Sequence, residues 1–114
     1  MFKTGQQHVE SLRDGRKVFI NGAEAGDVTT HPSFRRTVKS VEKMYDFQSR
    51  PENLELMTFE TDTGVRANRI WQLPRSYADL VERRRALEAW TELHGGFLGR
   101  APDPVASCIS GLYM

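Results

Sequence analysis

The sequence predicts an α+β fold that is mostly helical and contains two small β-hairpins. Residues 33–48 place apolar side chains at spacings of four, three and four, which is the periodicity of one face of a helix. These side chains are Phe34, Val38, Val41 and Tyr45. Asn21-Gly22 and Asp62-Thr63-Gly64 each follow a short run rich in β-branched or aromatic residues, as hairpin turns do. A chain of 114 residues has room for a single small domain, 1–114.

The beginning of the chain predicts a short helix followed by the first hairpin. Thr4 is a good N-cap, and Gln7 three residues later completes the capping-box pattern. Gly15 is expected to end this helix, because glycine readily adopts the left-handed conformation found at helix C-termini. Residues 17–20 then predict the first strand, and the Asn-Gly pair after it tolerates the positive φ of a tight turn.

The middle of the chain predicts a longer helix and then the second hairpin. Pro32 fits the first turn of this helix, where its missing N–H costs no hydrogen bond, and His31 is expected to bond to backbone at the helix entry. Pro51 ends the helix, because the residue before a proline is pushed out of the helical region. Residues 54–61 alternate with a period of two and predict a strand, and residues 65–73 predict the returning strand.

The third predicted helix has the strongest signals in the chain. Ser76 with Asp79 three residues later forms a second capping box, and the Gly95-Gly96 pair ends the helix. Its apolar side is expected to contain four large side chains, namely Leu80, Leu87, Trp90 and Leu93.

A final helix is expected after a loop that spans residues 97–104. Asp103 can cap this helix, and Pro104 can occupy its first position. Cys108 lies among apolar residues and is expected to be a buried, inert thiol. The helix reaches Met114 without a capping residue, which favours a piece of a longer chain; a native chain that ends in a packed helix is the alternative.

Composition and charge argue against several classes of protein. Hydrophobic residues make up 39% and charged residues 27% of the chain, as in a globular domain. The net charge is +1, so no nucleic-acid partner is expected, and the run Arg83-Arg84-Arg85 is expected to be the solvated side of a helix. We find neither a signal-peptide profile nor an apolar run of membrane-spanning length, so the expected compartment is the cytoplasm, without a membrane partner.

General rules of active-site chemistry assemble no complete catalytic site from this sequence. His8, His31 and His94 lack the helical spacings of metal ligands, so no metal site is predicted. Arg100 stands out, because it lies in a loop just before a helix N-terminus, where its guanidinium could orient a phenolate or a carboxylate. A loop ion pair between Arg100 and Asp103 is the structural alternative.

Several blocks of the sequence are distinctive when they are taken together. They are Thr4-Gly5-Gln6, residues 10–16, 27–35 and 45–46, Pro74-Arg75-Ser76 with Asp79-Leu80, and the loop from Gly95 to Asp103. In this order they resemble the N-terminal region of the oxygenase components of the 4-hydroxyphenylacetate 3-hydroxylase family. Each block alone is weak, but together they are specific and cover nearly the whole chain.

The resemblance implies part of a larger enzyme. In that family, whose architecture is like that of acyl-CoA dehydrogenases, the helical N-terminal region is followed by a β-barrel domain and a C-terminal helical bundle, both absent from residues 1–114. The members take reduced FAD from a separate flavin reductase and use O₂ to hydroxylate a phenol ortho to its OH. A homo-tetramer is expected for the full-length chain, and the FAD contacts are expected beyond residue 114, so this piece alone should be inactive.

The resemblance also gives two residues a role at the substrate. The matching arginine of the family lies in the substrate pocket, so Arg100 is expected to be catalytic and substrate-binding, with its charge stabilising phenolate character. The family commonly has an aromatic residue or histidine at the substrate-facing position where this chain has Pro104. One contact to 4-hydroxyphenylacetate is therefore missing, and a different phenol is expected.

Two other interpretations stay open at this point. The 4-hydroxybutyryl-CoA dehydratases share the fold and the opening region, although the loop 99–103 is not associated with them. A cysteine/histidine cluster for an iron–sulfur centre in the remaining sequence would identify them. The third interpretation is a non-catalytic, stand-alone interaction domain that docks to a partner.

Overall fold

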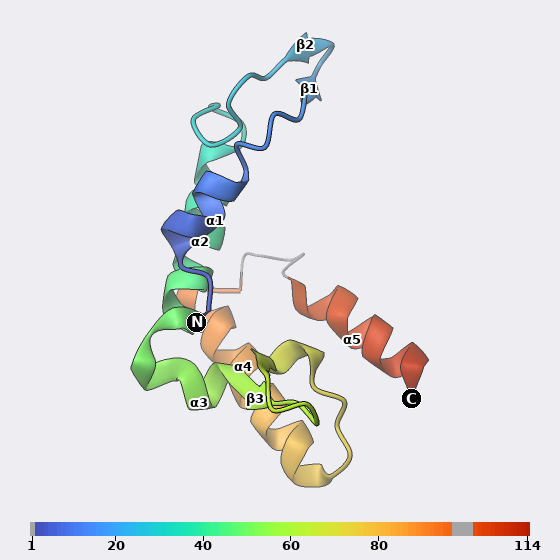
Figure 1. The fold of residues 1–114 in the computed structure, drawn as a ribbon. Helices are drawn as coiled ribbons and strands as arrows, with labels where there is room; N and C mark the ends of the chain where they lie inside the picture. The colour runs from blue at the N-terminus through green and yellow to red at the C-terminus, as the bar shows by residue number, and fades with distance from the viewer. Residues whose placement is uncertain (1, 97–101) are drawn as a thin grey trace. The chain divides into compact units, whose positions relative to one another are not determined.

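The computed structural model describes residues 2–96 and 102–114 (Figure 1). The chain forms two compact units, Met1–Arg50 and Pro51–Met114. Within the described residues there are five α-helices and two two-stranded antiparallel sheets. This content confirms the prediction of a mostly helical α+β fold with two small hairpins.

The first unit begins with helix α1 (Gly5–Ser11). Thr4 is its N-cap, and both hydrogen bonds of the capping box with Gln7 are present, so the predicted start is confirmed. The predicted stop at Gly15 is wrong, because the helix ends at Ser11. The N–H of Leu12 already donates to the carbonyl of Val9 at 3.2 Å, which is the tightened bond of a closing helical turn.

The first hairpin pairs strand β1 (Phe19–Ile20) with strand β2 (Ala23–Glu24). Asn21 has a φ of 50° and Gly22 a φ of 82°, which are the two left-handed residues that the tight turn requires. The predicted turn is therefore confirmed. Figure 1 shows this hairpin extending past the end of α1.

Helix α2 (Arg35–Ser49) is the long helix of the first unit. It starts three residues after Pro32, so the prediction of Pro32 in its first turn is wrong; Pro32 instead lies in a turn that precedes the helix. The Nδ1 atom of His31 accepts from the N–H of Ser33 at 3.2 Å, as predicted for the helix entry. The helix ends where expected, because Arg50 is extended with ψ 135° before the proline.

Helices α1 and α2 pack against each other through a very close approach at Gly5. Its N–H donates to Oδ1 of Asp46 at 2.7 Å, and a Cβ built on Gly5 would lie 2.5 Å from the carbonyl oxygen of Glu42. The rings of His8 and Tyr45 stack nearby with centroids 4.3 Å apart, and burial lowers the pKa of His8. Glycine is therefore required at position 5 by packing rather than by its φ angle.

The second unit opens with four short elements. They are the 3₁₀-helix η1 (Pro51–Asn53), helix α3 (Leu54–Met57), strand β3 (Thr58–Glu60) and, after a turn, strand β4 (Arg66–Asn68). A second 3₁₀-helix, η2 (Arg69–Trp71), follows β4 directly. The hairpin turn at 62–64 is confirmed by the pairing of β3 with β4. The predicted strand 54–61 is wrong over its first four residues, which form α3. The predicted strand 65–73 is wrong from Arg69 onward, where η2 begins.

Arg69 accounts for both differences. Its side chain is 9% exposed, and its Nε and Nη2 atoms donate to three backbone carbonyls near the end of α3. The acceptors are the carbonyl oxygens of Glu55 (2.7 Å), Leu56 (2.9 Å) and Thr58 (2.6 Å). Nη1 donates to Gln72 Oε1 at 2.9 Å and to Glu82 Oε2 at 2.7 Å. All five N–H donors of the guanidinium are therefore used. Helix α3 is a single turn, and its last carbonyl groups have no donor within the helix, so Arg69 supplies them.

Helix α4 (Tyr77–Leu93) begins and ends as predicted. Ser76 and Asp79 form the capping box. The two glycines that follow the helix have positive φ angles, 58° at Gly95 and 76° at Gly96. The N–H of Gly96 donates to the carbonyl of Thr91 at 3.1 Å, which satisfies one of the free carbonyls at the helix end.

The predicted apolar side of α4 is wrong in part. Leu80 is 50% exposed and Leu93 37% exposed, whereas Ala86 and Trp90, one turn apart, are the buried residues of the helix. The buried face of α4 thus consists of a small and an aromatic side chain near the middle of the helix, whereas the leucines near its two ends are exposed.

Helix α5 (Pro102–Tyr113) differs from its prediction at the start and in what it buries. It starts at Pro102, so the prediction of Asp103 as N-cap and Pro104 as the first residue is wrong; proline lacks an N–H and fits any place in a first turn.

Cys108 is exposed, and the prediction of a buried thiol is wrong. The helix buries Ala106 and Ser110, one turn apart, and Cys108 lies midway between them on the other side.

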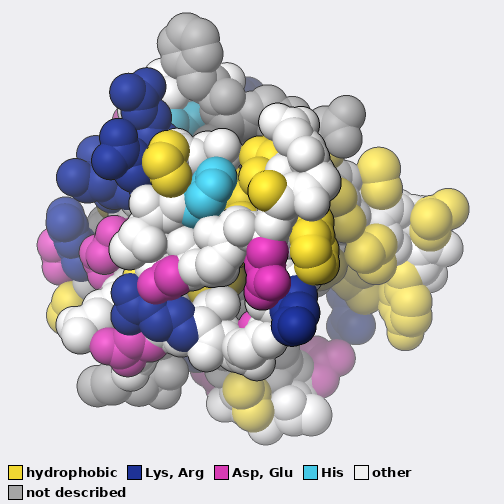
Figure 2. Space-filling view, turned by 90° about the horizontal axis from the view of Figure 1, so that it is seen from above, with side chains coloured by type: hydrophobic (Ala, Val, Ile, Leu, Met, Phe, Trp, Pro, Cys, Tyr) yellow, Lys and Arg dark blue, Asp and Glu magenta, His cyan; other side chains and the backbone are white. Residues whose placement is uncertain are grey.

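Large apolar side chains cover the outer side of α5. Those more than half exposed are Val105, Ile109, Leu112 and Tyr113. They form the apolar group at the right of Figure 2, on the side where α5 lies in Figure 1.

Replacing Gly5 by Ala should destabilise the first unit by about 1–3 kcal/mol, because the added methyl group has to displace the α2 backbone at Glu42. Urea unfolding followed by circular dichroism measures the change. The matched control is Gly111→Ala in α5, where a Cβ meets no described atom within 4 Å and alanine is the better helix former. Equal stability of Gly5→Ala and the natural chain would contradict the close approach.

Replacing Arg69 by Met should destabilise the second unit by about 3–5 kcal/mol, because three carbonyls and the Glu82 carboxylate lose their donor. Arg69→Lys keeps the charge but supplies a single nitrogen, so it should restore only part of the loss. The control is Arg84→Met, which removes an exposed ion pair with Glu88. If denaturant midpoints of the Arg69 and Arg84 variants coincide, the proposed role of Arg69 is wrong.

Candidate functional site

The structure places one of the two predicted substrate residues. Arg100 lies outside the described residues, and so does the predicted loop that contains it, so its role stays a prediction. Pro104 is exposed in the first turn of α5. The contacts that hold the start of α5 therefore define the part of the candidate site that can be described.

Arg83 of α4 hydrogen-bonds to both α5 and η2. Its Nη2 atom donates to the carbonyl of Ile70 at 3.0 Å and to Oγ of Ser107 at 2.8 Å, and its Nε lies 3.3 Å from the same carbonyl. Ser107 is one helical turn after Pro104. A hydrogen bond between two helices therefore lies one turn away from Pro104.

The prediction that Arg83-Arg84-Arg85 is a solvated run is wrong for its first member. Arg83 is half-buried and bonded, whereas Arg84 and Arg85 are exposed, and Arg84 pairs with Glu88 at 2.7 Å one turn along the helix. The sequence offered no local signal for this difference, because the acceptors of Arg83 are 13 and 24 residues away.

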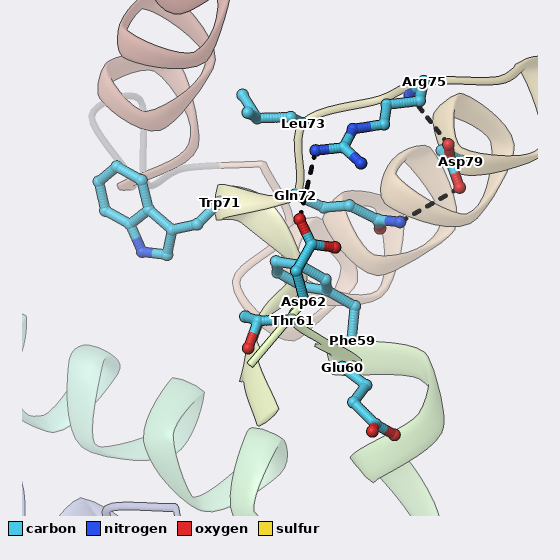
Figure 3. Close-up of a pocket in the computed structure, with 9 residues that line it drawn as sticks. All are labelled: Phe59, Glu60, Thr61, Asp62, Trp71, Gln72, Leu73, Arg75 and Asp79. Carbon is cyan, nitrogen blue, oxygen red and sulfur yellow. Dashed lines mark hydrogen bonds and ion pairs between the residues drawn. The ribbon is translucent and has the colours of Figure 1, made fainter. Parts of the chain in front are cut away.

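An open hollow of about 310 Å³ lies beside the second hairpin and the start of α4 (Figure 3). Its lining includes the ring of Phe59, the side chain of Gln72 and the backbone that leads to Arg75. Asp62 pairs with Arg75 at 3.4 Å across this hollow, and both side chains are largely exposed. Sequence reasoning had not singled out these residues as a site.

The electrostatics of this hollow are dominated by carboxylates. Asp79 accepts from the backbone N–H groups of Arg75 and Ser76, both at 2.9 Å, and from Gln72 at 3.3 Å. The bonds from Arg75 first, and then those from Ser76, lower the pKa of Asp79, so its carboxylate stays ionised. Asp62 and Glu60 add two further carboxylates to the lining.

This hollow does not fit a flavin. A flavin dinucleotide needs donors for its pyrophosphate, often the N–H groups of a helix N-terminus. Here the N-terminus of α4 is already occupied by its own capping carboxylate, Asp79, and further carboxylates line the space. No step of a flavin reaction is assigned to it.

Among residues 2–96 and 102–114, no group of three or more His, Cys, Asp or Glu side chains is arranged to hold a metal ion. In the same ranges, none of the helices combines the length and the apolar character needed to span a membrane.

Comparison with known sequences identifies the family. The model of the 4-hydroxyphenylacetate 3-hydroxylase N-terminal region matches residues 4–114. The oxygenase component of a 4-nitrophenol 4-monooxygenase/4-nitrocatechol 2-monooxygenase from Rhodococcus opacus is 45% identical over 101 residues, which are 88% of this chain and 19% of that relative. The chain thus spans about a fifth of the length of the curated relatives it matches.

Solved structures agree with the sequence comparison. The oxygenase component of a 4-hydroxyphenylacetate 3-monooxygenase, complexed with FAD and 4-hydroxyphenylacetate, matches with a TM-score of 0.79 and 33% identity over 88% of this chain and 21% of that chain. An archaeal 4-hydroxybutyryl-CoA dehydratase from N. maritimus matches with a TM-score of 0.67 and 26% identity over 81% of this chain and 18% of that chain. The chain therefore belongs to the 4-hydroxyphenylacetate 3-hydroxylase N-terminal family, as the sequence blocks predicted.

Proposed function

We propose that this chain is the N-terminal part of the oxygenase component of a two-component monooxygenase that ortho-hydroxylates a phenol with reduced FAD and O₂. The observation that carries the proposal is the family match over residues 4–114. Relatives with 36–45% identity are named as oxygenase components or monooxygenases that act on phenolic compounds. The remaining four fifths of such a chain would supply the flavin site, and a separate reductase would supply the reduced flavin in the cytoplasm.

Arg100 is the residue of this chain to which we assign the chemistry. Bound reduced FAD would supply the activated oxygen. A guanidinium beside the phenolic oxygen stabilises negative charge on that oxygen, and the charge spreads to the ortho carbon, which becomes the better nucleophile. The arginine holds its charge at every relevant pH and presents a fork of donors that suits an oxyanion. Its place in the sequence, two residues before the first residue of α5, supports this role, because a helix N-terminus favours an anion nearby.

Pro104 supports a phenol other than 4-hydroxyphenylacetate. Proline has no side-chain donor, so the side chain at this position, which is exposed on α5, can offer a substrate only apolar contact. The relative from Rhodococcus opacus is named for nitrophenol substrates and is 45% identical. We therefore propose a nitro-substituted, halogenated or bulkier phenol as the substrate class.

A dehydratase function is the second candidate, because the archaeal 4-hydroxybutyryl-CoA dehydratase has a similar fold over this region. The family match and the higher identity to monooxygenases favour hydroxylation. A cysteine/histidine cluster downstream of residue 114, together with an iron–sulfur absorption spectrum, would instead support the dehydratase. A stand-alone interaction domain would be supported by a reading frame that ends at Met114.

In the complete oxygenase chain, supplied with reduced FAD by a flavin reductase, Arg100→Ala should lower the hydroxylation rate about 10²- to 10³-fold while FAD affinity stays nearly unchanged. Hydroxylation of 4-nitrophenol and 4-hydroxyphenylacetate is followed by product analysis, and FAD binding by fluorescence. Arg85→Ala, which removes an exposed arginine, is the matched control. Loss of FAD binding with unchanged phenol affinity would show that Arg100 belongs to a different site.

The 114-residue chain alone should show no hydroxylase activity and no heat of binding when it is titrated with FAD. The reason is that the remaining four fifths of such a chain would supply the flavin site, and the hollow beside the second hairpin is lined by carboxylates. Isothermal titration calorimetry makes this measurement. Saturable binding of FAD to the isolated chain would contradict the proposal that the flavin site lies in the remaining four fifths of the oxygenase.

A further inference from the structure

An open hollow of about 520 Å³ lies in the first unit, beside α1, the start of α2 and the segment that leads into α2. Its volume is typical of sites for small molecules, which occupy about 300–1,000 Å³. Positive side chains dominate its lining, namely Arg13, Arg35, Arg36 and Lys39, and Glu42 contributes one carboxylate. A hollow lined mainly by charges of one sign concentrates ions of the opposite sign, so these residues indicate an anion site.

Three of these cations, Arg35, Arg36 and Lys39, form no ion pair within the part of the chain that the structure describes. Arg35 and Lys39 lie one turn apart on α2, and Arg36 lies three residues before Lys39. Like charges at these helical spacings repel each other and destabilise the helix. An anion bound between them relieves this repulsion.

The carboxylates of the first unit do not neutralise the hollow. Residues 1–50 contain nine Lys and Arg and six Asp and Glu, which leaves an excess of three positive charges. Four of the six carboxylates are already bonded, namely Glu10 to Gln6, Asp14 to Arg16, Asp27 to Arg13 and Asp46 to the N–H of Gly5. Of the other two, Glu24 lies in β2 and Glu42 lines the hollow.

Two further features of this hollow favour an anion. Nε of Arg13 donates to Oδ2 of Asp27 at 3.1 Å and its Nη2 donates to Oγ1 of Thr29 at 3.0 Å, so the guanidinium is oriented before a ligand binds. The first turn of α2 contains no acidic residue, and its N-cap Phe34 makes no side-chain hydrogen bond. The positive end of the helix dipole is therefore not neutralised by a capping side chain.

We propose that this hollow binds a small phosphate monoester, a function beyond phenol hydroxylation. Arg13 is paired with Asp27, so the three unpaired cations and Glu42 leave two positive charges in the lining. A phosphate monoester carries about 1.5–2 negative charges at pH 7 and three acceptor oxygens, whereas a carboxylate carries one charge. The apolar part of the lining, Val9 and Val38, suits the organic group of such an ester.

The test titrates the complete natural chain that contains residues 1–114 with phenyl phosphate in a calorimeter. Arg35→Gln and Lys39→Gln each remove one unpaired cation from an exposed position, so both variants should fold, which circular dichroism checks. Lys43→Gln is the matched control, because it removes an exposed lysine from the next turn of α2, outside the lining.

We expect the dissociation constant for phenyl phosphate to rise about tenfold in Arg35→Gln and in Lys39→Gln, as for the loss of one hydrogen bond to a charged group. In Lys43→Gln it should stay unchanged. Inorganic phosphate should bind more weakly than phenyl phosphate, because it lacks the ring that contacts the valines. Benzoate should also bind more weakly, because it carries one charge. Saturation with FAD should leave the binding of phenyl phosphate unchanged, because the flavin site is proposed in the remainder of the chain.

Absence of saturable binding of phenyl phosphate to the complete chain would overturn the proposal, and so would equal weakening in all three variants. Inorganic phosphate or benzoate that binds as tightly as phenyl phosphate would contradict a site for a monoester. Competition by FAD would assign the anion to the flavin site instead of this hollow. The titration needs no hydroxylase activity, so a failure of the proposed function leaves its result intact.

Discussion

The buried guanidinium of Arg69 is the interaction on which the second unit depends. Burying a charged group is costly unless its donors are satisfied, and here each of the five N–H groups has an acceptor. Three of these acceptors are backbone carbonyls at the end of α3, and a fourth is Glu82 on α4. One side chain therefore fixes a helical turn, the segment after the hairpin and the long helix relative to one another. Within this unit, a hydrophobic core of small extent, with Met57, Ile70 and Trp90 buried, is reinforced by a polar centre.

The features that could be predicted from sequence are those set by residues close together in the chain. Both capping boxes and the Asn21-Gly22 turn were confirmed, because donor and acceptor lie within three residues and no distant contact competes with them. The segment 54–57 was predicted as strand and is helical. Two of its carbonyls, those of Glu55 and Leu56, accept from Arg69, which lies 14 and 13 residues further along the chain, and no periodicity within the segment contains that information.

Periodicity also identified apolar side chains without showing which of them are buried in these units. Leu80 and Leu93 were expected inside and are exposed, and the expectation for Cys108 failed in the same way. The residues that α4 and α5 do bury are Ala86 and Trp90 in α4, and Ala106 and Ser110 in α5. Of the predicted site, Pro104 could be placed, whereas the role of Arg100 came from family resemblance, since a lone arginine in a loop has no local signature.

A series of side-chain contacts connects the elements of the second unit. From Arg69 the bonded contacts lead to Glu82, then along the backbone to Arg83, and from Arg83 to Ile70 and Ser107. Each step is a hydrogen bond or a peptide bond, so the start of α5 is tied to the most completely bonded side chain of the unit. Two arginines of this unit, Arg69 and Arg83, therefore supply side-chain hydrogen bonds between elements that are distant in sequence.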